Sequence, residues 1–312
     1  MKGRTGNNER DLLIDALEKM KAYNQKLLEK REQRLWREIS FPCSLSDAIH
    51  GLTREQMDRI RRNLELKNLS ALKKGELASE LVKWIPGEFK QLVHALDQGC
   101  YGLLKLAAAN DGIITNMGMA VSQLEPLMEY GLIFPGVYND QKALYMPLEL
   151  VNLFLKLDGP ELEKKVRRNT QWVMLTHGML YYFGVADPWL VKEKIRKLTG
   201  QEIDLLEFMK VISLASDFYG QIKLSPYGYK DHRVFDAKKI VDEHIMRPGV
   251  DFYPFSKRQL LKAGEPDYID RTPSMNSFIN FLMQHYELTW EDADEIAMQL
   301  TNMINMDSKP TL

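Results

Sequence analysis

Residues 52–85 read LTREQMDRIRRNLELKNLSALKKGELASELVKWI and predict two short helices joined by a tight connector. Thr53 and Gln56 have the spacing of a capping box, which opens the first helix. Apolar residues recur at helical spacing in both halves of the stretch, at Met57, Ile60 and Leu64 and then at Leu72, Leu77, Leu81 and Trp84 or Ile85. We therefore expect a helical pair over residues 41–86.

The connector and the start of the second helix, NLSALKKGEL at residues 68–77, resemble a known unit. This unit is the helix–extended–helix motif of the Rho termination factor N-terminal domain and of SAP-type domains. The shared pattern is a leucine, a small or polar pair, a hydrophobic residue, basic residues, an acidic residue and an apolar helix. Members of those families bind nucleic acid through the basic face of the unit. The resemblance, over residues 44–86, implies the same role here.

Lys and Arg side chains around the connector are the candidates for phosphate contact. The resemblance places the binding edge where Arg61, Arg62, Lys73 and Lys74 flank the connector. Carboxylates at Asp58, Glu65, Glu76 and Glu80 dilute this charge, so we expect weak and sequence-tolerant binding. An ordinary solvated helix face is the alternative interpretation. The predicted nucleic-acid-binding residues are Arg59, Arg61, Arg62, Lys67, Lys73, Lys74 and Lys83, with Arg54 as a further candidate.

The charge of the chain is unevenly distributed along its length. The net charge is −1, which taken alone argues against a dedicated nucleic-acid-binding protein. Residues 1–83, however, hold 18 Lys and Arg against 13 Asp and Glu, whereas the remainder holds 24 against 30. A basic N-terminal part followed by an acidic remainder fits a nucleic-acid-binding region carried by a scaffold. Charge, however, also fluctuates along any chain.

Length and composition are those of a globular protein. The 312 residues suffice for about two domains, and 45% of them are hydrophobic. No apolar run approaches a membrane span of about 20 residues, and MKGRTGNNERD at the N-terminus lacks the apolar core of a secretory signal. Cys43 and Cys100 are the only cysteines, which suits a reducing compartment. We expect a cytoplasmic protein with no membrane partner.

Residues 9–39 predict a long amphipathic helix that ends before Phe41-Pro42. Its apolar stripe could pack on the body of the protein, pair with a second copy or dock on a partner. Its members are Leu12, Leu13, Ala16, Leu17, Met20, Tyr23, Leu27, Leu28, Leu35, Trp36 and Ile39.

Residues 87–158 resemble a winged helix in layout. Helices are expected at about 88–97, 101–109 and 119–130, with a short strand at 113–115 and a hairpin whose polar tip is 139–142. The helix that would enter a DNA groove holds Glu125 and Glu129 but neither Lys nor Arg, and the wing tip offers only Lys142. We therefore expect this module to be structural or to contact protein.

Residues 159–312 predict a mainly helical C-terminal domain with an irregular loop at 223–229. The chain thus divides into a helix at 1–40, the helical pair at 41–86, the winged-helix-like module at 87–158 and this last domain. His177 follows an apolar helix and is expected to be a cap or a hydrogen-bonded core group. The aromatic and basic run 251–258 could stack on unpaired bases, but core packing is favoured.

The sequence lacks the common nucleotide, zinc-protease and hydrolase motifs. Asp231, His232, Glu243, His244 and Asp251 are close in sequence, but their spacing does not put two metal ligands on one helix face. We expect no metal, no cofactor and no enzymatic activity, unless Asp231, His232, Glu243 and His244 line a deep pocket in the C-terminal domain.

The sequence as a whole predicts a mainly α-helical, non-enzymatic protein associated with nucleic acid, either DNA or RNA. The alternative is a protein–protein adaptor that uses the acidic winged-helix-like module, the amphipathic helices and the 16 methionines as contact surfaces.

Overall fold

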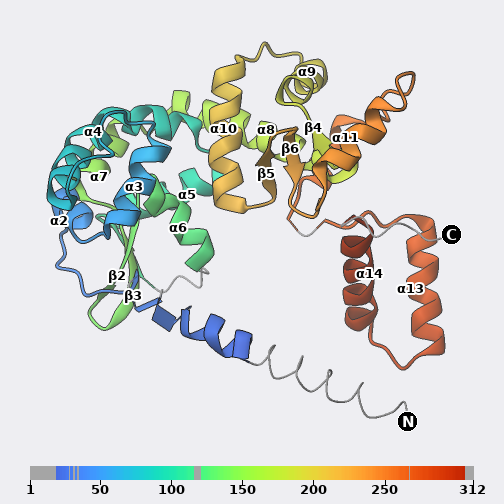
Figure 1. Ribbon diagram of the computed structural model, residues 1–312, viewed down its shortest axis with the longest axis horizontal. Helices are drawn as coiled ribbons and strands as arrows, with labels where there is room; N and C mark the ends of the chain where they lie inside the picture. The colour runs from blue at the N-terminus through green and yellow to red at the C-terminus, as the bar shows by residue number, and fades with distance from the viewer. Residues whose placement is uncertain are drawn as a thin grey trace, which may run out of the picture. The chain divides into compact units, whose positions relative to one another are not determined.

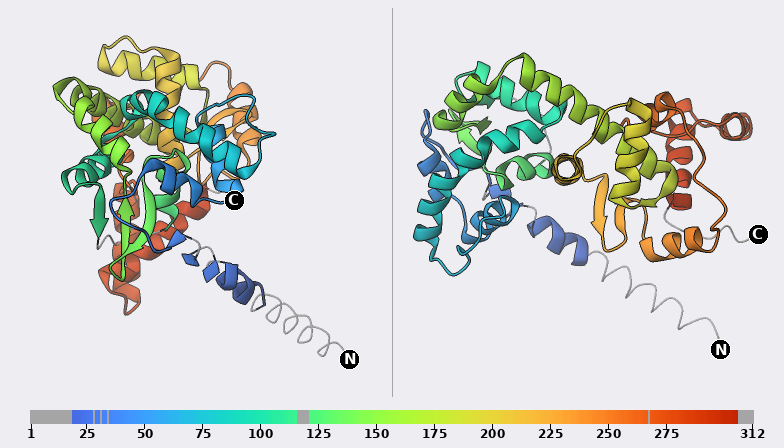
Figure 2. Two further views of the ribbon diagram at one scale, coloured as in Figure 1. Left: turned by 90° about the vertical axis from the view of Figure 1, so that its left-hand side faces the viewer. Right: turned by 90° about the horizontal axis from the view of Figure 1, so that it is seen from above.

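The computed structural model describes residues 19–27, 29–30, 32–33, 35–115, 121–266 and 268–305. The protein is mainly helical, as predicted, and carries two small antiparallel sheets (Figure 1; Figure 2). It divides into two compact units, unit 1 with residues 1–89 and 103–156, and unit 2 with residues 90–102 and 157–312. A bilayer-crossing helix needs about 20 apolar residues, and none of the described helices meets that requirement in both length and hydrophobicity.

The elements up to residue 157 are α2 (Leu45–His50), α3 (Arg54–Asn63), α4 (Lys74–Ala95), α5 (Gln98–Ala109), β1 (Ile113–Thr115), α6 (Val121–Glu129), β2 (Phe134–Tyr138), β3 (Gln141–Tyr145) and α7 (Leu148–Leu157). Those that follow are α8 (Pro160–Phe183), β4 (Val185–Ala186), α9 (Pro188–Thr199), α10 (Leu205–Tyr219), β5 (Ile222–Ser225), β6 (Gly228–Asp231), α11 (Ala237–Ile245), α12 (Lys257–Ala263), α13 (Pro273–His285) and α14 (Trp290–Asn305).

The two helices predicted from residues 52–85 are α3 and α4. The capping box of Thr53 and Gln56 is present at the start of α3, and Met57 and Ile60 are fully buried. The sequence predicts a break after Ile85, but α4 continues through Pro86 to Ala95. Buried apolar residues recur every four positions across the proline, so packing of one face outweighs the hydrogen bond that proline removes. These residues are Leu77, Leu81, Ile85, Phe89 and Val93.

The first sheet has the strand order β1-β3-β2 and is antiparallel throughout. The free edge of β2 is covered by the chain that follows the N-terminal helix: Ile39 N donates to Val137 O (3.0 Å) and Val137 N donates to Arg37 O (2.7 Å). The predicted helix to residue 39 is therefore too long. Helical residues end at Leu35, because residues 37–39 pair with β2 instead. The part of that helix before residue 19 lies outside the described residues.

Unit 2 is built around α8, which runs unbroken from Pro160 to Phe183. Two glycines let α8 and α12 cross closely: a Cβ on Gly178 would lie 2.0 Å from Leu260 O, and one on Gly264 would lie 2.0 Å from Met174 O. Such approach is possible only without side chains. The core around this crossing includes Trp172, Leu175, Met179, Phe208, Ile212 and Tyr229.

The second sheet, with the order β4-β6-β5, contradicts the predicted loop at 223–229. Residues 222–231 form a hairpin in which Leu224 pairs with Tyr229, and Gly228 takes a φ of 113° at the turn. Pro226 lies in the turn rather than in a strand, so it interrupts no ladder hydrogen bond. Burial of Tyr229 and Ile222 in the unit 2 core stabilises this hairpin.

Candidate nucleic-acid interface

The connector between α3 and α4 is held by arginine side chains. Glu65 and Asn68 adopt positive φ values of 55° and 63°, which turn the chain sharply. Arg54 Nη2 donates to Ser70 O (3.0 Å) and Leu72 O (3.1 Å), and it is also ion-paired with Asp58. These guanidinium contacts shape the connector, so Arg54 has a structural role.

Three of the seven predicted binding residues are engaged by carboxylates. Arg59 contacts Glu129 of α6 and Glu55 (2.9 Å), and its hydrogen bond to Glu129 raises its pKa. The pair of Arg61 Nε with Asp58 measures 3.0 Å, and that of Lys83 Nζ with Glu80 measures 2.7 Å. These three cations have their charge balanced within unit 1.

The other four predicted residues, Arg62, Lys67, Lys73 and Lys74, are exposed. Their side chains have no hydrogen bond or ion pair with any residue that the structure describes. Arg62 lies in the last turn of α3, Lys67 lies in the connector, and Lys73 and Lys74 lie where α4 begins. The unpaired cations thus occupy the connector, where the sequence predicts the binding edge.

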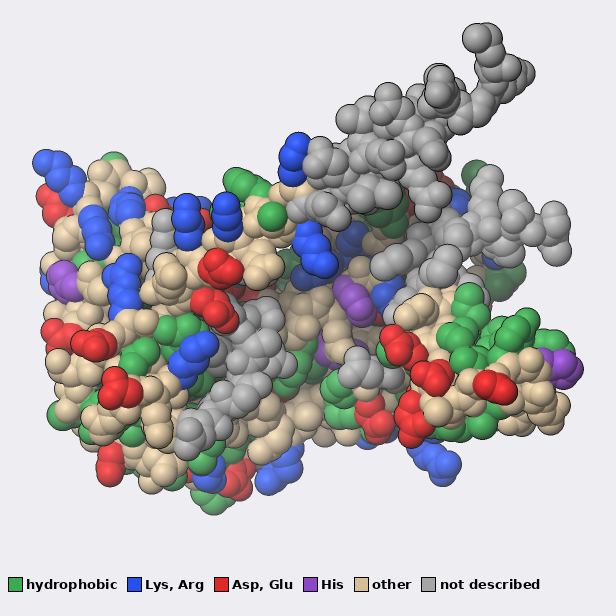
Figure 3. Space-filling view, turned by 90° about the horizontal axis from the view of Figure 1, so that it is seen from below, with side chains coloured by type: hydrophobic (Ala, Val, Ile, Leu, Met, Phe, Trp, Pro, Cys, Tyr) green, Lys and Arg blue, Asp and Glu red, His purple; other side chains and the backbone are tan. Residues whose placement is uncertain are grey.

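Carboxylates remain close to these cations along the chain. Glu65 and Glu76 are exposed, and a Glu76 carboxylate oxygen accepts a hydrogen bond from Lys73 N (2.8 Å). Figure 3 shows one face of the molecule, on which blue Lys and Arg side chains stand singly or in short rows with red Asp and Glu among them. The arrangement favours modest rather than tight binding of a polyanion.

In a winged-helix domain, α6 would be the helix that enters the DNA groove. Here α6 packs against α3. Leu127 and Met128 are buried, Asn63 Nδ2 donates to Glu129 O (3.1 Å), and Glu129 also holds Arg59. At the wing, Lys142 Nζ lies 4.9 Å from the centre of the Trp36 ring. These contacts engage the C-terminal part of α6 and Lys142 within unit 1.

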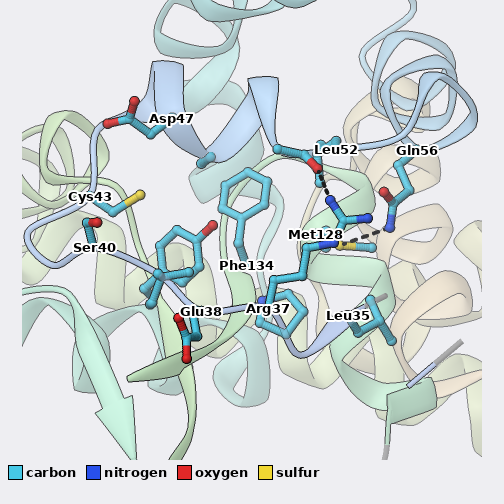
Figure 4. A pocket seen from close by; sticks show the side chains of 15 residues that line it. Leu35, Arg37, Glu38, Ser40, Cys43, Asp47, Leu52, Gln56, Met128 and Phe134 are labelled. Carbon is cyan, nitrogen blue, oxygen red and sulfur yellow. Dashed lines mark hydrogen bonds between the residues drawn. The ribbon is translucent and has the colours of Figure 1, made fainter. Parts of the chain in front are cut away.

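A cavity of about 360 Å³ lies beside the helical pair in unit 1. Figure 4 shows Arg37 directed toward the main chain, where its Nη1 donates to Gly51 O (3.0 Å), and Gln56 directed toward Met128 Sδ (3.9 Å). Cys43 lines the same cavity, and burial raises the pKa of its thiol. Because the thiolate is the nucleophilic form, this cavity has no activated cysteine.

A second cavity, of about 320 Å³, lies in unit 2 and is lined by polar residues. Asp231 and Arg233 are both buried there and form a bidentate ion pair (2.7 and 2.9 Å). His177, expected to be a cap or a hydrogen-bonded core group, is buried and has a backbone hydrogen bond with Gly264, whereas its Nε2 has no partner among the described residues. Burial lowers the pKa of His177 to about 4, so the ring is neutral at pH 7.

The five acidic and histidine residues weighed as metal ligands do not converge. Asp231 and His232 line the second cavity, and Asp231 also lines a neighbouring cavity with Glu243, but His232 does not line that cavity and Glu243 does not line the second one. His244 packs edge-on against Phe252 (4.9 Å), and Asp251 pairs with Lys194 (3.5 Å). Within the described parts of the chain, no group of three or more His, Cys, Asp and Glu side chains could hold a metal ion.

The aromatic run 251–258 is mostly packed rather than free for stacking on bases. Phe252 lies 4.1 Å from the Phe183 ring, and Phe255 stacks on Tyr182 at 4.0 Å. Tyr253 is exposed. The core-packing interpretation therefore holds for the two phenylalanines.

No family model, curated protein or solved structure matches this chain. The sequence singles out Asp231 but does not predict its buried ion pair with Arg233, nor the pair of Arg168 with Glu207 (2.6 Å). The basic run at 164–168 could have drawn attention to Arg168. No local signal identifies Glu207 as its partner, because the two are 39 positions apart.

Proposed function

We propose that this protein binds the phosphate backbone of nucleic acid, weakly and without strong sequence preference, through the connector of its helical pair. The observation that carries the proposal is the group of exposed, unpaired cations Arg62, Lys67, Lys73 and Lys74. Other cations of the pair are neutralised by carboxylates, so these four remain available for a ligand anion.

The position of two lysines supports a phosphate ligand. Lys73 and Lys74 lie at the N-terminus of α4, where the helix dipole repels a cation by about 0.3–1 kcal/mol. A phosphate placed there would interact favourably with both ammonium groups and with the positive end of the helix dipole, where the Glu76 carboxylate already accepts a hydrogen bond from Lys73 N. The unfavourable placement of the lysines is thereby offset when an anion binds.

We also propose the types of module to which the helical pair and residues 87–158 belong. The helical pair is similar in sequence to Rho N-terminal and SAP-type units. The order α5, β1, α6, β2, β3 and the sheet order β1-β3-β2 support a winged-helix-like layout. Because α6 is packed against α3, we assign the winged-helix-like module the role of a scaffold that supports the helical pair.

The test is fluorescence anisotropy of the full chain with labelled 20-nucleotide single-stranded RNA, single-stranded DNA and duplex DNA over a range of salt concentrations. We expect the double variant Lys73→Glu and Lys74→Glu to lose at least tenfold in affinity at low salt. The slope of log Kd against the logarithm of the salt concentration should also decrease, because two phosphate contacts are lost and each contributes about 0.7 to 0.9 to that slope.

The matched control is the double variant Lys197→Glu and Lys223→Glu, which makes the same change in net charge at exposed lysines of unit 2. It should bind as the wild type does. The proposal is wrong if no probe binds at low salt, or if the two double variants lose affinity equally.

A further inference from the structure

The hairpin of α13 and α14 has little core of its own. Its buried residues are Ile279, Ala293 and Ala297, with Met275 packed beside them. Six large apolar side chains instead expose between 37% and 60% of their area: Phe278, Phe281, Met283, Tyr286, Trp290 and Leu300. Figure 3 shows this green patch on the right, bordered by red carboxylates. Exposed apolar surface of this kind marks a docking site.

The hairpin is also strongly acidic. Residues 270–305 contain six Asp and Glu but only Arg271 as a basic residue, a net charge of −5. Arg271 is ion-paired with Asp294, whereas Glu287, Glu291 and Glu295 are exposed. An occupant of this surface must therefore be both apolar and basic.

The N-terminal helix of the same chain has that chemistry. Met20, Tyr23 and Leu27 lie at positions i, i+3 and i+7 of a helix and expose between 47% and 63% of their area. Residues 19–37 contain seven Lys and Arg against two Glu, a net charge of +5. The stripe matches the spacing by which an amphipathic helix binds an apolar groove.

We infer that the α13–α14 hairpin of one copy binds the N-terminal helix, residues 19–35, of a second copy of this chain. Both surfaces expose large apolar side chains, and their net charges are opposite, +4 for residues 19–35 and −5 for residues 270–305. Reciprocal exchange forms two identical contacts and closes a two-fold symmetric dimer. This association is separate from nucleic-acid binding, because neither surface includes the connector cations.

The first experiment is sedimentation of the full chain at about 1 to 100 μM in low and high salt. We expect a dimer at low salt that weakens as salt increases, because salt screens the paired charges. The double variants Met20→Glu/Tyr23→Glu and Phe281→Glu/Trp290→Glu should each be monomeric. The control Leu206→Glu/Phe235→Glu alters exposed apolar residues elsewhere and should remain dimeric.

Mixing the two monomeric variants is the decisive measurement. The intact hairpin of the first variant can bind the intact helix of the second, so an equimolar mixture should form a heterodimer with one docking contact. Circular dichroism should show that both variants keep the wild-type helix content. A wild type that stays monomeric at 100 μM, a dimer that survives either substitution pair, or a mixture that forms no heterodimer would each overturn the inference.

Discussion

Asp231 and Arg233 form a bidentate ion pair across one intervening residue, with both side chains buried in unit 2. The Arg233 guanidinium also lies 4.5 Å from the Tyr181 ring. The pair therefore joins the end of β6 to α8, where the polar cavity of unit 2 lies.

Removing one partner of this pair leaves the other charge buried and uncompensated. We expect Arg233→Met to lower the free energy of unfolding by about 3–5 kcal/mol, measured by urea denaturation. Lys238→Met, which breaks the exposed pair with Asp242, is the control and should leave the unfolding midpoint unchanged. Equal effects of the two substitutions would contradict the structural role given to Asp231 and Arg233.

The close crossing of α8 and α12 predicts a steric penalty at Gly178. A Cβ there would overlap Leu260 O, so Gly178→Ala should destabilise the protein by several kcal/mol or prevent folding. Gly87→Ala is the matched control, because no atom lies within 4 Å of the added Cβ in α4. It should stabilise the protein by about 0.5–1 kcal/mol. Thermal melts that rank the two variants in the opposite order would refute this crossing geometry.

The buried imidazole of His177 predicts a pH dependence of stability. Burial lowers its pKa from 6.5 to about 4, so below pH 6.5 the unfolded chain takes up a proton that the folded protein does not. Stability should fall as the pH drops from 6.5 to 4 and level off below 4, with a total loss of about 3 kcal/mol.

The measurement is the urea midpoint of the wild type and of His177→Gln between pH 7.5 and pH 4. Burial also lowers the pKa values of His94 and His244, and these residues titrate in both proteins. The variant should therefore show a shallower fall with decreasing pH. Parallel curves would show that His177 does not carry the effect.

The two thiols should be unreactive in the folded protein. Burial raises the pKa values of Cys43 and Cys100, which lowers the fraction of thiolate. We expect slow reaction with Ellman's reagent at pH 8 and rapid reaction of both thiols in urea. The exposed position Ser79 offers a control, because the cysteine of Ser79→Cys should react at once in the native state. Rapid native labelling of the wild type would contradict the burial of Cys43 and Cys100.

Local patterns in the sequence determined several helix starts and the first hairpin. The predicted capping box of Thr53 with Gln56 is present. In the structure Ser256 and Gln259 form a second capping box, and Asp187 and Gly200 cap the two ends of α9. These features depend on hydrogen bonds and dihedral angles within a few residues. A single sequence therefore contains the information that they require.

Tertiary packing decided the remaining features. The helix α4 passes through Pro86 because one continuous apolar face is buried, and residues 222–231 form strands because Tyr229 is buried in the core. The sequence likewise could not show which cations remain unpaired, because Arg59 is paired with Glu129, which lies 70 positions away. Local spacing determines which residues can form a helix or carry a charge, whereas contacts between distant segments determine which charges are neutralised and which face water.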